Sequence, residues 1–218
     1  MISRLRNDGC SMQAITYKND MKIKYSPILM LFFLFLNACG EEPSYTPKPR
    51  AFPKVEYPER GYRQFEKDYC NFTFEYPAYA EIQQDTLFFG EKPAHPCWFD
   101  IFMPAFDSRV HCSYYPISRE KTFEQLKSDA FEMVEWHNKK ANYIQELPIK
   151  REGGINGFAF VIEGPAASPF QFYLTDSTDN FLRGALYFNT QARPDSLEPI
   201  YQFVEEDILH LIETFQWR

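Results

Sequence analysis

The feature that most constrains this chain is a short apolar run behind a small cationic segment. Residues 28–36 are nine consecutive apolar side chains, and Lys22 and Lys24 lie just before them. A membrane-spanning helix needs roughly 20 apolar residues, so this run is too short to cross a bilayer. A short apolar run behind lysines is instead typical of a secretory signal, so we expect everything after it to fold in an exported compartment.

The apolar run ends in Leu36-Asn37-Ala38-Cys39, which resembles a bacterial lipobox. In that motif the cysteine is acylated and becomes the first residue of the mature protein. The sequence therefore predicts a signal peptide over 21–38 and lipid attachment at Cys39. Gly40 stands where enterobacterial proteins retained in the inner membrane carry aspartate, which favours an outer-membrane, periplasm-facing location.

Residues 1–20 are polar and of mixed charge, unlike the start of an export signal. We expect translation to start at Met21, so that this leader reflects a mis-assigned start. Met12 is a second candidate start, and a cytoplasmic leader is the alternative interpretation.

The charge balance bounds the possible partners. The chain has 23 Lys and Arg against 30 Asp and Glu; removal of residues 1–38 takes away five basic and two acidic side chains, which leaves a formal charge of about −10. Such a surface repels phosphate backbones and anionic headgroups. The sequence therefore predicts no nucleic-acid partner, and membrane contact through the lipid anchor alone.

Five prolines among charged residues mark the segment from the lipobox to residue 62, at positions 43, 47, 49, 53 and 58. Few apolar residues recur here, so the segment is expected to be an extended, semi-rigid tether over 39–62. An ordinary linker is favoured over a spacer that sets the reach toward a partner. One domain is expected over 63–218.

The high aromatic content, 14 Tyr and 22 Phe, favours a β-rich core. Phe72, Phe74 and Tyr76 alternate with polar residues, which predicts a strand over 71–77 that Pro77 ends. Two hairpins are expected, one from strands 97–103 and 109–117, the other from strands 170–175 and 181–189. Further strands are expected at 80–89, 148–152 and 157–163.

Two helices are expected. Thr122 and Gln125 have the spacing of a capping box, and apolar residues recur at three and four from Phe123 to Ile144, which predicts a helix of about 22 residues. A C-terminal helix is expected from Asp195 or Ser196 to about Gln216. The predicted fold is thus a single α+β domain, an antiparallel sheet packed by a mid-chain and a C-terminal helix.

Cysteine usage allows one internal disulfide. Cys10 precedes the mature chain and Cys39 is the acylation site, which leaves Cys70, Cys97 and Cys112 in an oxidising compartment. Cys70 and Cys97 lie near predicted loops and are the preferred disulfide. Cys112 lies in mid-strand and is expected to be a buried free thiol.

Catalytic, cofactor and metal signatures are absent from the sequence: it contains no nucleophile elbow, Walker loop, dinucleotide fingerprint, His-Glu-x-x-His or paired Cys-x-x-Cys. The prediction is no enzymatic activity, no catalytic residue, no cofactor and no metal. A hydrolytic triad built on Ser168 or Ser177 with a His and an Asp is the less favoured alternative, because triads are defined by geometry.

Four other positions have a functional and a structural interpretation, and the structural one is favoured at each. His137 could be a ligand or base, but is expected to be a packed histidine at the core edge. Arg183, in mid-strand, could contact a ligand, but is expected to pair with a carboxylate of the adjoining loop. The loop with Asp176, Asp179 and Asn180 could bind Ca²⁺, but it is expected to be a plain hairpin turn. On the C-terminal helix, Glu206, His210 and Glu213 are spaced as ligands could be, but they are expected to form a salt-bridged, solvent-exposed face.

Several stretches across the mature chain resemble the gliding motility lipoprotein GldD family of Bacteroidetes. The matching stretches are Cys39-Gly40-Glu41, Pro47-Lys48-Pro49, Phe74-Glu75-Tyr76-Pro77, Pro96-Cys97-Trp98-Phe99, Ala166-Ala167-Ser168, residues 171–178, residues 181–188 and residues 207–214. The resemblance implies a lipid-anchored protein needed for surface gliding and linked to type IX secretion, acting through other envelope proteins. It supplies no catalytic residue.

A Phe-x-Phe-x-Tyr-Pro strand that opens an antiparallel sheet, together with a mid-chain and a C-terminal helix, is also similar to the Mog1/PsbP-type sandwich. This is a likeness of fold that carries no function. Against an interaction role stands one further alternative from another class. A small-ligand or glycan-binding domain would use an aromatic cleft near Trp98, Tyr114 and Tyr115.

Overall fold

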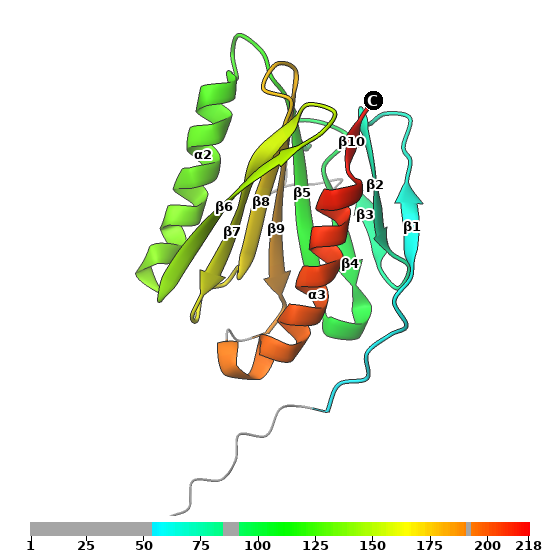
Figure 1. Ribbon diagram of the computed structural model, residues 1–218, viewed down its shortest axis with the longest axis vertical. Helices are drawn as coiled ribbons and strands as arrows, with labels where there is room; N and C mark the ends of the chain where they lie inside the picture. Colours follow the sequence, from blue (N-terminus) through cyan, green and yellow to red (C-terminus); the bar gives the residue numbers. More distant parts are fainter. Residues whose placement is uncertain (1–53, 85–91, 191–192) are drawn as a thin grey trace, which may run out of the picture. The chain divides into compact units, whose positions relative to one another are not determined.

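The computed structural model describes residues 54–84, 92–190 and 193–218 (Figure 1). The predicted leader, the signal peptide over 21–38, Cys39 and most of the predicted tether lie outside the described residues, as do positions 85–89 of the predicted second strand. The expectations about these segments therefore stay predictions.

The described residues form two antiparallel sheets and two α-helices, which confirms the predicted α+β class. The larger sheet has the strand order β3-β4-β5-β9-β8-β7-β6. Its strands are β3 (Glu81–Gln84), β4 (Phe99–Met103), β5 (Ser108–Pro116), β9 (Asn180–Phe188), β8 (Phe170–Thr175), β7 (Ile155–Glu163) and β6 (Tyr143–Arg151). The smaller sheet, of order β1-β2-β10, contains β1 (Tyr62–Phe65), β2 (Phe72–Pro77) and β10 (Gln216–Trp217).

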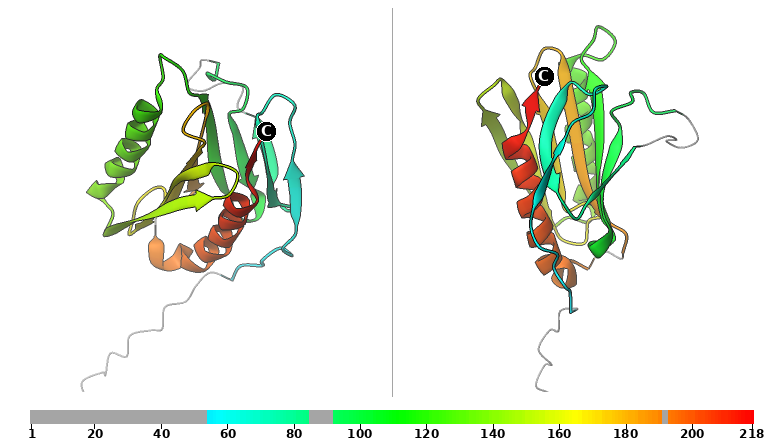
Figure 2. Two further views of the ribbon diagram at one scale, coloured as in Figure 1. Left: turned by 45° about the horizontal axis from the view of Figure 1, so that its top comes forward. Right: turned by 90° about the vertical axis from the view of Figure 1, so that its right-hand side faces the viewer.

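Alternation along the strands divides the larger sheet into two faces. On β9, Leu182 and Leu186 join one core cluster, whereas Phe181 joins another. The first face carries α3 (Pro194–Thr214) and the smaller sheet, and we call it the α3 face; the second carries α2 (Phe123–Glu135), and we call it the α2 face. Figures 1 and 2 show α3 beside the smaller sheet and α2 apart from both.

The α3 face is closed by stacked aromatic rings. Phe72 and Phe74 are fully buried, as the alternation predicted, and the Phe65 ring stacks on Phe74 with a centroid distance of 4.6 Å. Phe215, at the end of α3, stacks on Phe72 at 5.6 Å. The apolar side of α3 lies on these rings, and its innermost residues are Val204, Ile208 and Leu211.

The predicted capping box is present: the Thr122 hydroxyl accepts the amide of Gln125, whose side chain accepts the amide of Thr122. The predicted length of about 22 residues is wrong. The α-helix has 13 residues and gives way to the 3₁₀ turn η3 (Trp136–Lys139). Ile144 belongs to β6, which starts five residues before the predicted position 148 because its whole length finds a partner in β7.

The predicted hairpins are confirmed. Strands β4 and β5 pair in antiparallel register across the 3₁₀ turn η2 (Pro104–Phe106), and β8 pairs with β9. The turn between β6 and β7 places Gly153 and Gly154 at φ values of 78° and 75°, a conformation that suits glycine at both central positions of a tight hairpin.

Two short strands of the smaller sheet, β1 and β10, were not predicted. In addition, the last part of the predicted tether packs on the domain. The Tyr57 ring lies 4.9 Å from that of Phe203, and Arg60 Nε lies 3.0 Å from a carboxylate oxygen of Asp207. The prolines of this segment gave no sign that its last residues contact α3, and the extended backbone expected over 39–62 stays a prediction.

Candidate functional site

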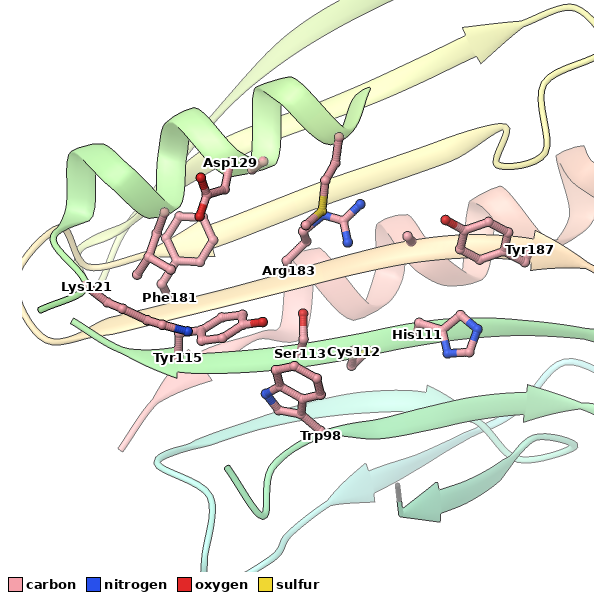
Figure 3. A pocket seen from close by; sticks show the side chains of 14 residues that line it. Trp98, His111, Cys112, Ser113, Tyr115, Lys121, Asp129, Phe181, Arg183 and Tyr187 are labelled. Atoms are coloured by element: carbon pink, nitrogen blue, oxygen red, sulfur yellow. The ribbon is translucent and has the colours of Figure 1, made fainter. Parts of the chain in front are cut away.

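A cleft of about 370 Å³ lies on the α2 face between α2, β5 and β9, and Trp98, just before β4, lines it as well (Figure 3). Strand alternation builds its floor. Arg183 and Tyr187 of β9 point to this face, and Ser113 is the register partner of Arg183 on β5. Helix α2 supplies one wall, through Leu126, Ala130 and Met133.

Arg183 is the central polar residue of the cleft. Its guanidinium is half-buried and donates from Nη2 to Oε1 of Gln171 at 2.6 Å. Within the described residues no carboxylate lies at ion-pair distance from it, so the expected pairing with the adjoining loop is not seen. Burial lowers the pKa of the Arg183 guanidinium.

Gly184 allows β9 to present Arg183 on one face while its other face packs tightly against the core. A Cβ at Gly184 would lie 2.3 Å from the Phe172 ring, so only glycine lets that ring pack against the strand. Arg183 therefore faces the cleft, whereas Gly184 faces the core, where the lack of a side chain makes room for Phe172.

Aromatic side chains border the cleft on the β4 and β5 side. The Trp98 ring meets that of Tyr115 edge-on at 5.3 Å, and Lys121 Nζ lies 4.3 Å above the Tyr115 ring. The predicted aromatic cleft therefore contains Trp98 and Tyr115. It does not contain Tyr114, which points to the α3 face and donates its hydroxyl to Asn180.

A carboxylate and a histidine lie together at the rim. Asp100 is 4% exposed and accepts from Arg109 Nη1 at 3.1 Å and bonds to His111 Nδ1. This pair resembles two members of a hydrolytic triad, but no serine hydroxyl in the described part of the chain bonds to His111. The Ser168 hydroxyl donates to the carbonyl of Phe170 instead.

Ser177 also lacks, among the described residues, the histidine partner that a nucleophilic serine needs in a triad. It lies in the loop between β8 and β9 at a φ of 68°, where its amide donates to the Thr175 hydroxyl. No imidazole contacts it among the hydrogen bonds of the described residues. Neither serine of the hydrolase hypothesis has the partner that the hypothesis requires.

The structural interpretations of His137 and the Asp176 loop agree with the structure. His137 lies half-buried in η3, and burial, followed by the charge of Arg183, lowers its pKa. Asp176 accepts three backbone amides of its own loop, those of residues 178, 179 and 180. Burial alone would raise the Asp176 pKa, but these bonds and one from the Asn180 side chain outweigh it and lower the pKa.

The candidate ligands on α3 separate into ion pairs. His210 Nε2 lies 2.6 Å from a Glu75 carboxylate oxygen on β2, and Glu206 pairs with Arg60. Glu213 takes part in neither of these two ion pairs. No group of three or more His, Cys, Asp or Glu side chains in the described ranges is arranged to hold a metal ion.

Cys70 and Cys97 form a disulfide, with Cα atoms 5.7 Å apart, that joins the loop before β2 to the loop before β4. Cys112 is a buried free thiol on the α3 face. Burial, followed by the Asp100 carboxylate, raises the Cys112 pKa well above its ordinary value, which disfavours the thiolate.

The family comparison settles what kind of protein this is. The model of the gliding motility lipoprotein GldD matches residues 42–217. The chain belongs to the GldD family. GldD proteins are described as motility lipoproteins, so the resemblance drawn from the sequence is confirmed and a lipid-anchored place in the cell envelope follows.

Two further comparisons add less about this GldD chain. The solution structure of cyanobacterial PsbP (CyanoP) from Synechocystis sp. PCC 6803 is similar at 11% identity and a TM-score of 0.42, over 79% of this chain and 100% of that one. A likeness this distant supports no argument about this chain. The search of curated proteins found no match.

The described residues contain no helix with the length and apolar character needed to span a membrane.

Proposed function

We propose that this GldD protein is held in the envelope by acyl chains on Cys39 and acts without catalysis, as a structural and interaction component of gliding linked to type IX secretion. The observation that carries the proposal is the family match over 42–217, because it spans the folded domain and not an isolated motif. The partners would be other envelope proteins of the same machinery.

The described surface supports a role in protein contacts. Three large apolar side chains at or near α2 are strongly exposed: Trp136 at 64%, Tyr143 at 58% and Met133 at 45%. Aromatic residues and methionine are enriched at protein interfaces. A partner that covers this region would remove apolar surface from water and gain affinity from it.

Attachment through Cys39 would be stable because a bacterial lipoprotein carries more than one acyl chain. Each buried methylene contributes about 0.8 kcal/mol, and a single chain binds a membrane only reversibly. Gly40 favours release to the outer membrane, with the domain facing the periplasm.

The anchor is tested in a deletion strain complemented with variants. Cys39→Ala should leave the precursor uncleaved, abolish labelling by radioactive palmitate and stop colony spreading. Cys112→Ala is the matched control, because it removes a free cysteine of the domain outside the lipobox, and it should be processed, labelled and spread as the wild type is. A processed and labelled Cys39→Ala protein would contradict the anchor assignment.

The linkage to secretion is tested by crosslinking in intact envelopes. Crosslinks to gliding or type IX components, weakened by Trp136→Ala, would support the interaction role. Crosslinks confined to unrelated envelope proteins would count against it.

The cleft favours a second candidate function, the binding of a small ligand. Its volume lies at the lower end of the range for ligand sites, and a charged group lies among apolar walls. Glycan binding is the weaker form of this candidate, because Trp98 is only 8% exposed and its ring offers no open stacking platform.

A further inference from the structure

We propose that the cleft beside α2 binds the carboxylate of a small acid with an aromatic or branched apolar body, and that Arg183 is the carboxylate's partner. This inference rests on the second candidate function above, ligand binding, and not on the lipoprotein role. The chemistry is that of a monoanion on an apolar body, whether a free acid or the C-terminus of a peptide.

The first argument is charge. A guanidinium withdrawn from water is costly unless an anion compensates it. On the same sheet face Arg109 has such a partner, since its Nη1 lies 3.1 Å from Asp100. Arg183 is less exposed to water than a surface arginine, yet its hydrogen-bond acceptor is the neutral amide of Gln171. A bound anion would supply the missing charge.

The second argument is geometry. A guanidinium has five N–H donors in a planar fork that matches a carboxylate. Gln171 accepts from Nη2, and the Tyr187 hydroxyl is a further neutral neighbour. Figure 3 shows the Arg183 guanidinium between α2 and β5, on the cleft side of the sheet, with Ser113 across from it. Donors therefore remain for a ligand that enters the cleft.

The third argument is the chemistry of the walls. Apolar side chains of α2, together with Phe181, face the aromatic pair Trp98 and Tyr115 across the cleft. An apolar ligand body would lie between them while its charged end reaches Arg183. A fully polar ligand would leave these walls unused.

The number of charges in the site favours a monoanion over a phosphate. Among the residues described in the cleft lining, Arg183 is the cation on the floor, whereas Lys121 lies over Tyr115. Asp129, exposed on the α2 wall, repels any anion in the cleft, and it repels a dianion about twice as strongly as a monoanion. A carboxylate can pair with Arg183 at the smaller cost.

The test uses the full mature lipoprotein in detergent and four probe acids: phenylacetate, indole-3-acetate, isovalerate and N-acetyl-phenylalanine. At least one acid should bind in calorimetry and raise the unfolding temperature, because a ligand that binds only the folded state stabilises it. Its uncharged amide should bind about tenfold more weakly or not at all. Failure of all four acids, or equal binding of acid and amide, would overturn the inference.

Substitutions of Arg183 test whether this residue contacts the ligand. Arg183→Gln should lose acid binding by about tenfold or more, and Arg183→Lys should retain part of it, since lysine keeps the charge without the fork. Arg63→Gln, on β1, is the matched control and should bind as the wild type does. Acid binding unchanged in Arg183→Gln would overturn the assignment; if that variant does not fold, the acid and amide comparison on the wild type decides.

Two further probes separate the ligand sources. Phenyl phosphate that binds more tightly than phenylacetate would overturn the choice of a monoanion. A pentapeptide ending in phenylalanine that binds more tightly than N-acetyl-phenylalanine would assign the site to a protein C-terminus, and the reverse order to a free acid. The motility role has its own test in Cys39→Ala, so the failure of either proposal can be recognised separately.

Discussion

The two faces of the larger sheet differ in how they are covered. The α3 face is closed by a second sheet, a helix of 21 residues and a stack of phenylalanine rings. The α2 face carries a helix of 13 residues, and a cleft of about 370 Å³ lies between this helix and strands β5 and β9. Both faces use the same strands, so the difference lies in what alternate residues of each strand contact.

This difference separates stability from function. On the α3 face, apolar side chains contribute burial and packing, and substitutions there should act through folding. On the open part of the α2 face, polar and charged groups border the cleft, and substitutions there should change binding with little effect on stability. Four variants or treatments can break or sharpen this comparison.

The largest effect is expected for Phe72→Ala on the closed face. Phe72 is fully buried among the rings of Phe65, Phe74, Phe99 and Phe215, and truncation should cost about 3–5 kcal/mol of unfolding free energy. Urea unfolding measures the loss. Phe131→Ala, the same truncation on the half-buried face of α2, should cost clearly less; equal losses would mean that the two faces are equally packed.

Next in size is the disulfide that joins the smaller sheet to the larger one. Cys70 and Cys97 are 27 residues apart in the sequence, so their link should restrict the unfolded chain and contribute about 2–4 kcal/mol. The double variant Cys70→Ser/Cys97→Ser should show this loss in urea. When the unreduced protein is unfolded and treated with iodoacetamide, mass spectrometry should show Cys112 labelled and Cys70 and Cys97 unlabelled. Labelling of all three would contradict the pairing.

A smaller effect is expected at the junction of β1 and α3, where the Tyr62 hydroxyl donates to Asp207 at 2.9 Å. Burial, followed by this bond, raises the Tyr62 pKa from 10.0 to about 12. The folded state therefore holds the proton longer than the unfolded state, and stability present below pH 10 should be lost as the pH rises toward 12.

Tyr62→Phe removes both the bond and the titration. It should cost about 1 kcal/mol near neutral pH, and its unfolding free energy should fall less steeply than that of the wild type between pH 10 and 12. Parallel pH profiles would show that Tyr62 does not carry this dependence.

The smallest effect on stability is expected for Trp136→Ala, because the side chain is 64% exposed. Its unfolding free energy should stay within about 0.5 kcal/mol of the wild type. A loss of several kcal/mol would show that Trp136 supports the fold and would remove it from the proposed contact surface.

Local signals in the sequence predicted much of this fold. Alternation at Phe72 and Phe74 and the capping box of Thr122 and Gln125 each act within a few residues, and the structure contains both. The end of α2 was missed because Ala141 and Ile144 continue a helical spacing although Ile144 pairs with β7. Strand β10 was missed because two residues show no alternation, and only pairing with β2 makes them a strand.

The cleft could be predicted only in part. Trp98 and Tyr115 were selected for their chemistry, and both border the cleft, whereas strand parity places Tyr114 on the other face. Arg183 was noticed as a charge within an apolar strand, but its lack of a carboxylate partner depends on where the Asp176 loop folds. The backbone amides of that loop donate to the Asp176 carboxylate, so Asp176 does not pair with Arg183.

The most direct measurement of the central claim, that the open face is where this GldD protein works, is colony spreading of a deletion strain that expresses Arg183→Gln. The variant should reach the envelope at wild-type abundance by immunoblot and lose spreading, while Arg63→Gln at the same abundance spreads normally. Wild-type spreading by an Arg183→Gln protein that no longer binds acid would contradict the claim.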